Sequence, residues 1–253
     1  MKDTYAVVLA AGKGTRMGSD RPKVLHELAG KPMLFYTLEK LNNAGIGKII
    51  VVIGYKGNEV REAIDNGISF SNNIEYREQP EQKGTGDAVR CGIRDLKGAK
   101  NILVVNGDDS AFYNEDTVKK VLDNHKESDA AITFVSIVKQ DPTGFGRIIR
   151  AGGKVKNIVE EKDVNMGQRQ IKEVNAGFYV FNFSWLKENI EKIKLSKTGE
   201  YYIVDLVKIA VENGDKVKVY KLENESEWYG VNTKDQLMTA DRIMREKVSS
   251  LID

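Results

Sequence analysis

Cysteine and histidine are nearly absent from this sequence. Its 253 residues include one cysteine, Cys91, and two histidines, His26 and His125. A single cysteine excludes an internal disulfide and a cysteine-built zinc site. The two histidines lie far apart in the sequence, so we do not expect a histidine-rich metal site.

The sequence also lacks an excess of charge and any long hydrophobic run. Lys and Arg total 39 against 37 Asp and Glu, a net charge of +2, which gives no reason to expect a nucleic acid or an anionic membrane as a partner. No apolar run approaches the roughly 20 residues of a membrane span, and the N-terminus has no signal-peptide h-region. With 41% hydrophobic residues and only 4 Pro, the chain is neither disordered nor fibrous. We expect a cytoplasmic, globular protein.

Apolar strands and amphipathic helices alternate along the first half of the chain. This order predicts βαβ crossovers and a Rossmann-like, doubly wound and mainly parallel sheet. The predicted strands are 5–10, 48–55, 74–77, 101–105 and 130–138, and the predicted helices are 33–43, 58–65, 85–96 and 115–127.

The second half has a different pattern. A hairpin is predicted where residues 147–150 and 155–160 flank Gly152 and Gly153. We therefore expect one domain over residues 1–253, with a smaller mixed β lobe over the parallel sheet. The remaining predicted strands are 173–181 and 216–222, and the remaining helices are 185–193, 201–213 and 234–251.

A loop of small residues follows the first predicted strand, at the edge where open α/β sheets bind ligands. Small residues let the backbone approach a ligand closely, and successive N–H groups can hold phosphate oxygens. Arg16 and Lys23 add positive charge nearby, which favours phosphate binding over a plain turn. No P-loop is present, and Gly18 comes one residue too late for a dinucleotide fingerprint, which disfavours an NAD-dependent oxidoreductase. The loop starts with Leu9, Ala10, Ala11 and Gly12.

Residues 9–17 and 20–25 resemble the signature of the sugar-1-phosphate nucleotidyltransferases. Six further motifs occur in that family's order and span nearly the whole chain. Together they are most similar to the uridyltransferase domain of the bifunctional N-acetylglucosamine-1-phosphate uridyltransferases. The six motifs are 82–88, 142–148, 158–163, 175–177, 199–202 and 230–232.

The resemblance implies a role for each matched residue. Arg16 and Lys23 would be catalytic, and Asp108 and Asn232 would bind Mg²⁺. Gln79 would face the uracil base. The full nucleotide-binding set would be Leu9, Ala10, Ala11, Gly12, Gln79, Gly84, Thr85 and Gly107, and the sugar-binding set Gly144, Glu160 and Asn175. The nucleotide part would cover 1–110, the sugar part 111–233 and a C-terminal helix 234–253.

Several of these residues also have a purely structural interpretation. Thr85 or Asn232 could be a helix N-cap, Gly144 a turn, and Glu160 a solvated charge. Asn106, Asp109 and Ser110 depart from the family pattern, which leaves the sugar and metal details open. Asp109 could support the neighbouring Asp108 or cap a helix near residues 114–116.

The implied reaction is the Mg²⁺-dependent synthesis of UDP-N-acetylglucosamine and pyrophosphate from UTP and N-acetylglucosamine 1-phosphate. Alternatives are the same chemistry with another pair, such as dTTP or UTP with glucose 1-phosphate, a more distant cytidylyltransferase, or a non-catalytic nucleotide-sugar sensor. The sequence contains no hexapeptide repeats of the family's acetyltransferase domain, so we expect no acetyl transfer. The oligomeric state is left open.

Overall fold

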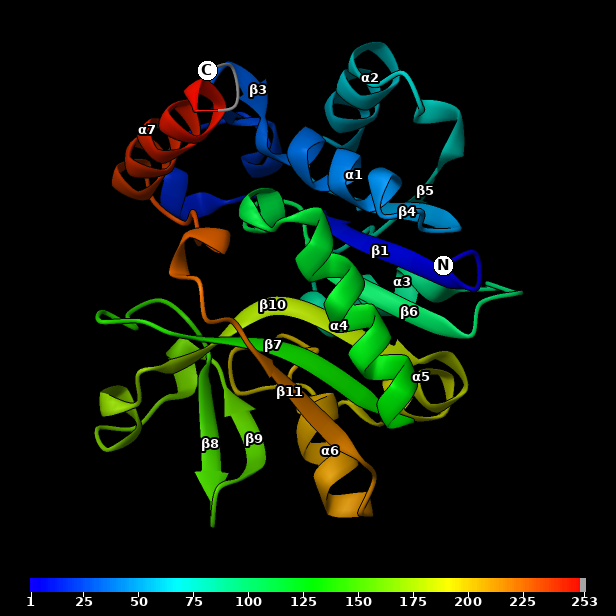
Figure 1. Cartoon of the computed structure of the whole chain (residues 1–253), viewed down its shortest axis with the longest axis vertical. Helices are drawn as coiled ribbons and strands as arrows, with labels where there is room; N and C mark the ends of the chain where they lie inside the picture. Colours follow the sequence, from blue (N-terminus) through cyan, green and yellow to red (C-terminus); the bar gives the residue numbers. More distant parts are fainter. Residues whose placement is uncertain (251–253) are drawn as a thin grey trace.

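The computed structural model of the chain describes residues 1–250 and contains a nine-stranded sheet (Figure 1). The strand order along its main path is β11-β7-β10-β6-β1-β4-β5. Neighbouring strands are parallel except β10, which is antiparallel to both β6 and β7. The doubly wound, mainly parallel sheet is confirmed. The strand predicted over 173–181 is β10, but its antiparallel placement in the middle of the sheet was not predicted. These strands are β1 (Thr4–Ala10), β4 (Lys48–Ile53), β5 (Ile74–Glu78), β6 (Asn101–Asn106), β7 (Ile132–Val138), β10 (Glu173–Asn182) and β11 (Val217–Lys221).

Helices cover both faces of this sheet. The helix over Met33–Asn43 shows why, because Leu34, Leu38 and Leu41 fall on one side and are all buried. One apolar cluster joins the sheet to α1 (Met33–Asn43), α2 (Gly57–Gly67) and α4 (Glu115–Ser128). A second cluster joins the opposite face to α3 (Thr85–Ile93), α5 (Phe183–Asn189) and α6 (Asp205–Asn213). The site described below lies at the edge where β1, β4, β5 and β6 end, called here the carboxyl edge.

The last helix, α7 (Lys234–Ser249), packs away from the sheet on a third cluster that includes Met17 and Phe112. Two strands too short to be predicted, β2 (Glu27–Leu28) and β3 (Lys31–Pro32), lie beside it. The sequence places apolar residues on one side of this helix, of which Ala240 and Met244 are buried while Val248 is 37% exposed. Leu251 and the end of the predicted helix lie outside the described residues. The helix predicted from residue 201 begins only at Asp205.

The predicted hairpin forms a small lobe below the sheet in Figure 1. It consists of β8 (Arg147–Ala151) and β9 (Lys154–Val159), and Arg147 of β8 pairs with Val174 of β10. Arg147 is fully buried and contacts Glu161 at 2.7 Å. Removing one member of such a buried pair leaves an uncompensated charge, so this pair fixes the loop that follows β9.

Within residues 1–250, no helix has the length and apolar character needed to cross a membrane.

The close packing of α3 on the sheet can be tested at Gly92. A Cβ at this position would lie 2.6 Å from Val7 Cγ1 and 3.0 Å from Val52 Cγ2. We expect Gly92→Ala to lower the free energy of unfolding by about 1–2 kcal/mol, because overpacking outweighs the gain in helix propensity. Gly167→Ala is the matched control, since its helical backbone and open surroundings predict a change within about 0.5 kcal/mol. Equal urea midpoints for the two variants would contradict the packing account.

Candidate active site

Three distant segments of the chain meet at the carboxyl edge of the sheet. The first is the loop after β1, which carries Arg16 and Lys23. The second is the turn after β6, which carries Asp108 and lies beside β1 because Gly107 N donates to Leu9 O at 2.9 Å. The third is the segment that enters α7 and carries Asn232. The sheet topology therefore brings together the four residues expected to be catalytic or metal-binding.

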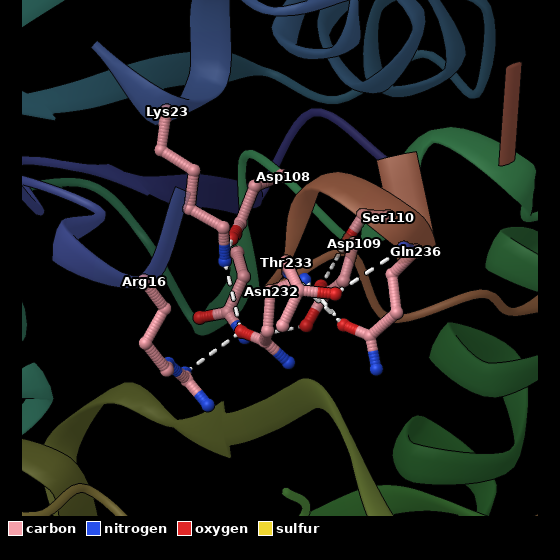
Figure 2. A network of polar contacts seen from close by, with 9 residues as sticks. Arg16, Lys23, Asp108, Asp109, Ser110, Asn232, Thr233 and Gln236 are labelled. Carbon is pink, nitrogen blue, oxygen red and sulfur yellow. Dashed lines mark hydrogen bonds and ion pairs between the residues drawn. The ribbon is translucent and has the colours of Figure 1, made fainter. Parts of the chain in front are cut away.

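Their side chains form one polar cluster (Figure 2). Asn232 Oδ1 accepts hydrogen bonds from Arg16 Nη2 at 2.9 Å and from Lys23 Nζ at 3.0 Å. The Lys23 ammonium also forms an ion pair with the Asp108 carboxylate, and both side chains are about 15% exposed. Two cationic groups and two oxygen ligands from three segments therefore face one another in a partly shielded site.

Asn232 is not the N-cap of α7, so this structural interpretation is wrong. Thr233 caps the helix, because its Oγ1 accepts from Gln236 N at 3.2 Å. In return, Gln236 Oε1 accepts from the backbone N of both Thr233 and Asn232, at 3.2 and 2.7 Å. This capping box fixes the backbone of Asn232 and leaves its side chain for the cluster.

The oxygens of Asp108 and Asn232 suit a hard divalent cation. Both contact the Lys23 ammonium, which shows that they can converge on a single positive centre. Mg²⁺ is usually held by one or two protein oxygens together with substrate phosphates and water. Within residues 1–250 no group of three or more His, Cys, Asp or Glu is arranged to hold a metal.

The predicted nucleotide residues begin at the end of β1. Ala11 O accepts from Tyr55 N at 3.0 Å, which ties this strand end to the end of β4. A Cβ built on Gly12 would meet no heavy atom within 4 Å, so a ligand can approach its backbone. Leu9 and Ala10 are the last residues of β1 and share this edge.

Gln79, which is expected to face the uracil base, has both of its amide hydrogens engaged within the protein. Its Nε2 donates to Gly84 O at 3.1 Å and to Asp87 Oδ2 at 2.8 Å. Because both N–H groups are engaged, Oε1 is the atom that Gln79 can offer a ligand. The residue is 3% exposed and lines a cavity of about 530 Å³ beside the ends of β4 and β5.

Thr85 is not the N-cap of α3, because Gly84 occupies that position. The Thr85 hydroxyl instead accepts from Ile203 N at 3.0 Å, and Gly86 N donates to Tyr201 O at 2.8 Å. A Cβ on Gly84 would lie 2.5 Å from Tyr201 O, so no larger residue fits there without a shift. These contacts join the start of α3 to the segment before α6.

The residues expected to bind a sugar lie between this cluster and the lobe. Asn175 N donates to Gly146 O at 2.9 Å, which places the loop containing Gly144 beside β10. Glu160 directly follows β9. Burial raises the pKa of its carboxyl to about 7, helped by the negative charges of Glu200, Asp205 and Asp163. It is therefore not the ordinary solvated charge of the structural interpretation.

Tyr179 was missed by the sequence analysis. It is 2% exposed, and its hydroxyl finds no hydrogen-bond partner within the described part of the chain. Burial raises the pKa of this hydroxyl well above its usual value, and the nearby carboxylates of Glu160 and Asp109 add to the rise. The local sequence held no signal for it. Tyr179 is thus a buried hydroxyl on β10, close enough to Glu160 and Asp109 to feel their charges.

Asp109 does not cap α4. The start of this helix is instead contacted by Glu227, whose Oε2 accepts hydrogen bonds from Asn114 N and Thr117 Oγ1. Asp109 Oδ2 accepts from Asn106 Nδ2 at 2.9 Å and its Oδ1 from Ser110 Oγ at 3.3 Å. Burial and the neighbouring charge of Asp108 raise the pKa of Asp109 to about 8. The three residues that depart from the family pattern therefore form one hydrogen-bonded group beside Asp108.

Comparison with known proteins extends over nearly the whole chain. Residues 5–247 match the family described as nucleotidyl transferase. Bifunctional protein GlmU of Acetivibrio thermocellus is 36% identical over 250 residues, covering 98% of this chain and 53% of that protein. Bifunctional protein GlmU of Streptococcus thermophilus is 38% identical over 247 residues, covering 97% of this chain and 52% of that protein. The chain thus spans about half the length of these curated relatives.

A solved structure supports the same fold. The crystal structure of UDP-glucose pyrophosphorylase complexed with UDP-glucose superimposes with a TM-score of 0.82 and covers 96% of this chain and 99% of that one. The two sequences are 18% identical, so the likeness concerns the fold alone.

The raised pKa of Asp109 predicts a pH dependence of stability. An aspartate in the unfolded chain has a pKa of about 4. In the folded protein the pKa of Asp109 is about 8, so its carboxyl keeps its proton over a wider pH range. Between these values the folded state binds more protons, so the free energy of unfolding falls as the pH rises. We expect Asp109→Asn to lose less stability than the parent between about pH 6 and about pH 8 in urea titrations. The exposed Asp123→Asn is the control and should follow the parent, and an Asp109→Asn variant that also follows it would contradict the prediction.

Proposed function

The chain belongs to the nucleotidyl transferase family, and from this premise we propose that it transfers the uridylyl group of UTP to N-acetylglucosamine 1-phosphate. The products are UDP-N-acetylglucosamine and pyrophosphate. The observation that carries the proposal is the convergence of Arg16 and Lys23 on Asn232, with Asp108 on the same Lys23 ammonium. The uridylyl and N-acetylglucosamine specificity rests on the motif resemblance.

The proposed reaction needs no protein base. A phosphate oxygen of the sugar phosphate attacks the α-phosphorus of UTP, forming a new P–O bond. The bond between the α-phosphorus and the bridging oxygen to the β-phosphate breaks, and its electron pair leaves with pyrophosphate. The second pKa of a phosphate monoester is about 6, so the nucleophile is largely a dianion at neutral pH. This fits a polar cluster whose charged side chains are Arg16, Lys23 and Asp108.

Catalysis then depends on positioning and on neutralising charge. Arg16 is exposed on the loop after β1, where it can bind the β- and γ-phosphates and neutralise the leaving pyrophosphate. Lys23 lies deeper, between Asp108 and Asn232, where it can contact the two phosphates being joined. Asp108 and Asn232 would hold Mg²⁺, which as a Lewis acid polarises phosphate oxygens when bound.

The base side of the site supports a pyrimidine with an N–H group on its pairing edge. Uracil carries N3–H between two carbonyl oxygens. Gln79 Oε1 can accept from that N–H, because Gly84 and Asp87 occupy its amide hydrogens and prevent the reverse orientation. Thymine has the same edge, so dTTP is the natural competitor of UTP.

The direct test is pyrophosphate release with Mg²⁺. UTP, dTTP, CTP, GTP and ATP are each paired with N-acetylglucosamine 1-phosphate, glucose 1-phosphate and mannose 1-phosphate. We expect the highest kcat/KM for UTP with N-acetylglucosamine 1-phosphate. A higher kcat/KM for another pair would overturn the proposed specificity but leave the proposed reaction type intact. If no pair releases pyrophosphate while calorimetry shows that a nucleotide sugar binds, the protein is a sensor and not an enzyme.

Lys23 is the residue whose removal best tests the mechanism. We expect Lys23→Ala to lower kcat about a hundredfold or more, because a charge aimed at the reacting phosphates is lost. The variant should still be folded at the assay temperature, which circular dichroism checks.

Lys13→Ala is the matched control for this variant. It removes a lysine from the same loop, but one whose ammonium lies over the Tyr55 ring, 5.3 Å from the centroid, rather than in the cluster. We expect it to keep most of the turnover. Near-normal turnover in Lys23→Ala would exclude Lys23 from the mechanism.

A further inference from the structure

We propose that Asp20, Tyr55 and Lys56 form a latch that holds the loop 12–22, with Arg16 on it and Lys23 directly after it, in its nucleotide-binding position. This inference rests on the proposed function, since it assigns these three residues a positioning role in that site. None of them belongs to the polar cluster of Arg16, Lys23, Asp108 and Asn232.

In the latch, two side chains contact the two oxygens of one carboxylate. Tyr55 Oη donates to Asp20 Oδ1 at 2.6 Å, and Lys56 Nζ contacts Asp20 Oδ2 at 2.6 Å. Lys56 is a non-glycine residue with φ +49°, a conformation that is uncommon for a lysine. Its ammonium also contacts Glu59 at 3.3 Å. The turn between β4 and α2 therefore presents a hydroxyl and an ammonium to the far end of the loop.

Apart from the latch, the loop is attached by the Lys13 ammonium over the Tyr55 ring and by the buried Met17 and Pro22. In the described part of the chain, the backbone hydrogen bonds of residues 12–22 stay local, such as Met17 N to Gly14 O and Gly18 N to Thr15 O. Met17 anchors the middle of the loop, because its side chain is buried in the third apolar cluster. Beyond Met17, Asp20 is the residue through which the loop reaches the β4–α2 turn.

The contacts that Arg16 and Lys23 make with the protein would be exchanged for contacts with phosphates when substrates bind. In the free protein Arg16 and Lys23 contact Asn232 and Asp108. If these cations turn to phosphates, their internal contacts break. The contacts of Asp20 involve no residue of the polar cluster and persist, although Lys56 also lines the cavity beside Gln79. The latch therefore sets the fraction of molecules whose loop is already in the binding position. The apparent dissociation constant scales inversely with that fraction.

Asp20→Asn is the test variant, and because Asp20 is 84% exposed its replacement should not disturb folding. We expect the UTP dissociation constant, measured by calorimetry without sugar phosphate, to rise about threefold to tenfold. The kcat at saturating UTP should stay within about twofold, because bound nucleotide holds the loop in place. A merely structural role would lower kcat through loss of active protein and leave the UTP affinity unchanged.

Two further variants complete the design. Glu27→Gln is the matched control, because it removes another exposed ion pair of this loop, Arg21 to Glu27 at 3.0 Å, without touching the latch. The exchange Asp20→Lys with Lys56→Asp should recover part of the lost UTP affinity, since it restores the ion pair with its charges reversed but not the Tyr55 hydrogen bond.

Limited trypsin digestion tests the latch without any activity. Cleavage after Lys13 and Arg16 should be faster in Asp20→Asn than in the parent or Glu27→Gln. Equal cleavage and equal UTP affinity in all three proteins would overturn the proposal. If the parent releases no pyrophosphate from any substrate pair but its loop is still protected by Asp20, the proposed function fails and the latch stands.

Discussion

The convergence of the Asp108 carboxylate and the Asn232 amide oxygen on the Lys23 ammonium is the interaction on which the site depends. A different part of the fold positions each of these three residues. Asp108 is delivered by a buried central strand, Lys23 by the loop after the neighbouring strand, and Asn232 by the capping box of α7. In a partly shielded site, a lysine between two oxygens limits the cost of holding the carboxylate there. The same oxygens are thereby kept close enough for a metal ion and phosphates.

The two halves of the chain are joined by the segment before α6. Tyr201 N donates to Lys83 O at 2.8 Å, and Ile203 N donates to the Thr85 hydroxyl, so this segment packs on the base side. On its other side, Glu200 contacts Lys162 of the lobe at 2.7 Å. One short segment thus contacts both the predicted base-binding and the predicted sugar-binding regions. The order of the strands places the phosphate cluster between these regions.

Much of this arrangement was predictable because it follows from local pattern. Apolar runs and helical spacing gave the parallel strands and α1, and the motif order identified Arg16, Lys23, Asp108 and Asn232, which the fold brings together. The rest depends on contacts between distant residues. Neither the antiparallel placement of β10 nor the engagement of Gln79 by Asp87 has a signal in the local sequence. The buried Tyr179 hydroxyl and the Asp20 contact with Tyr55 and Lys56 likewise arise only when separate segments meet.

The central claim is that Lys23, Asp108 and Asn232 form the phosphate and metal site. A crystal structure with Mg²⁺ and a non-reactive UTP analogue tests it most directly. The account predicts that Lys23 leaves Asp108 and contacts phosphate oxygen, with Mg²⁺ bound by Asp108 and Asn232. A complex in which the Lys23–Asp108 pair is unchanged and the triphosphate binds elsewhere would contradict it.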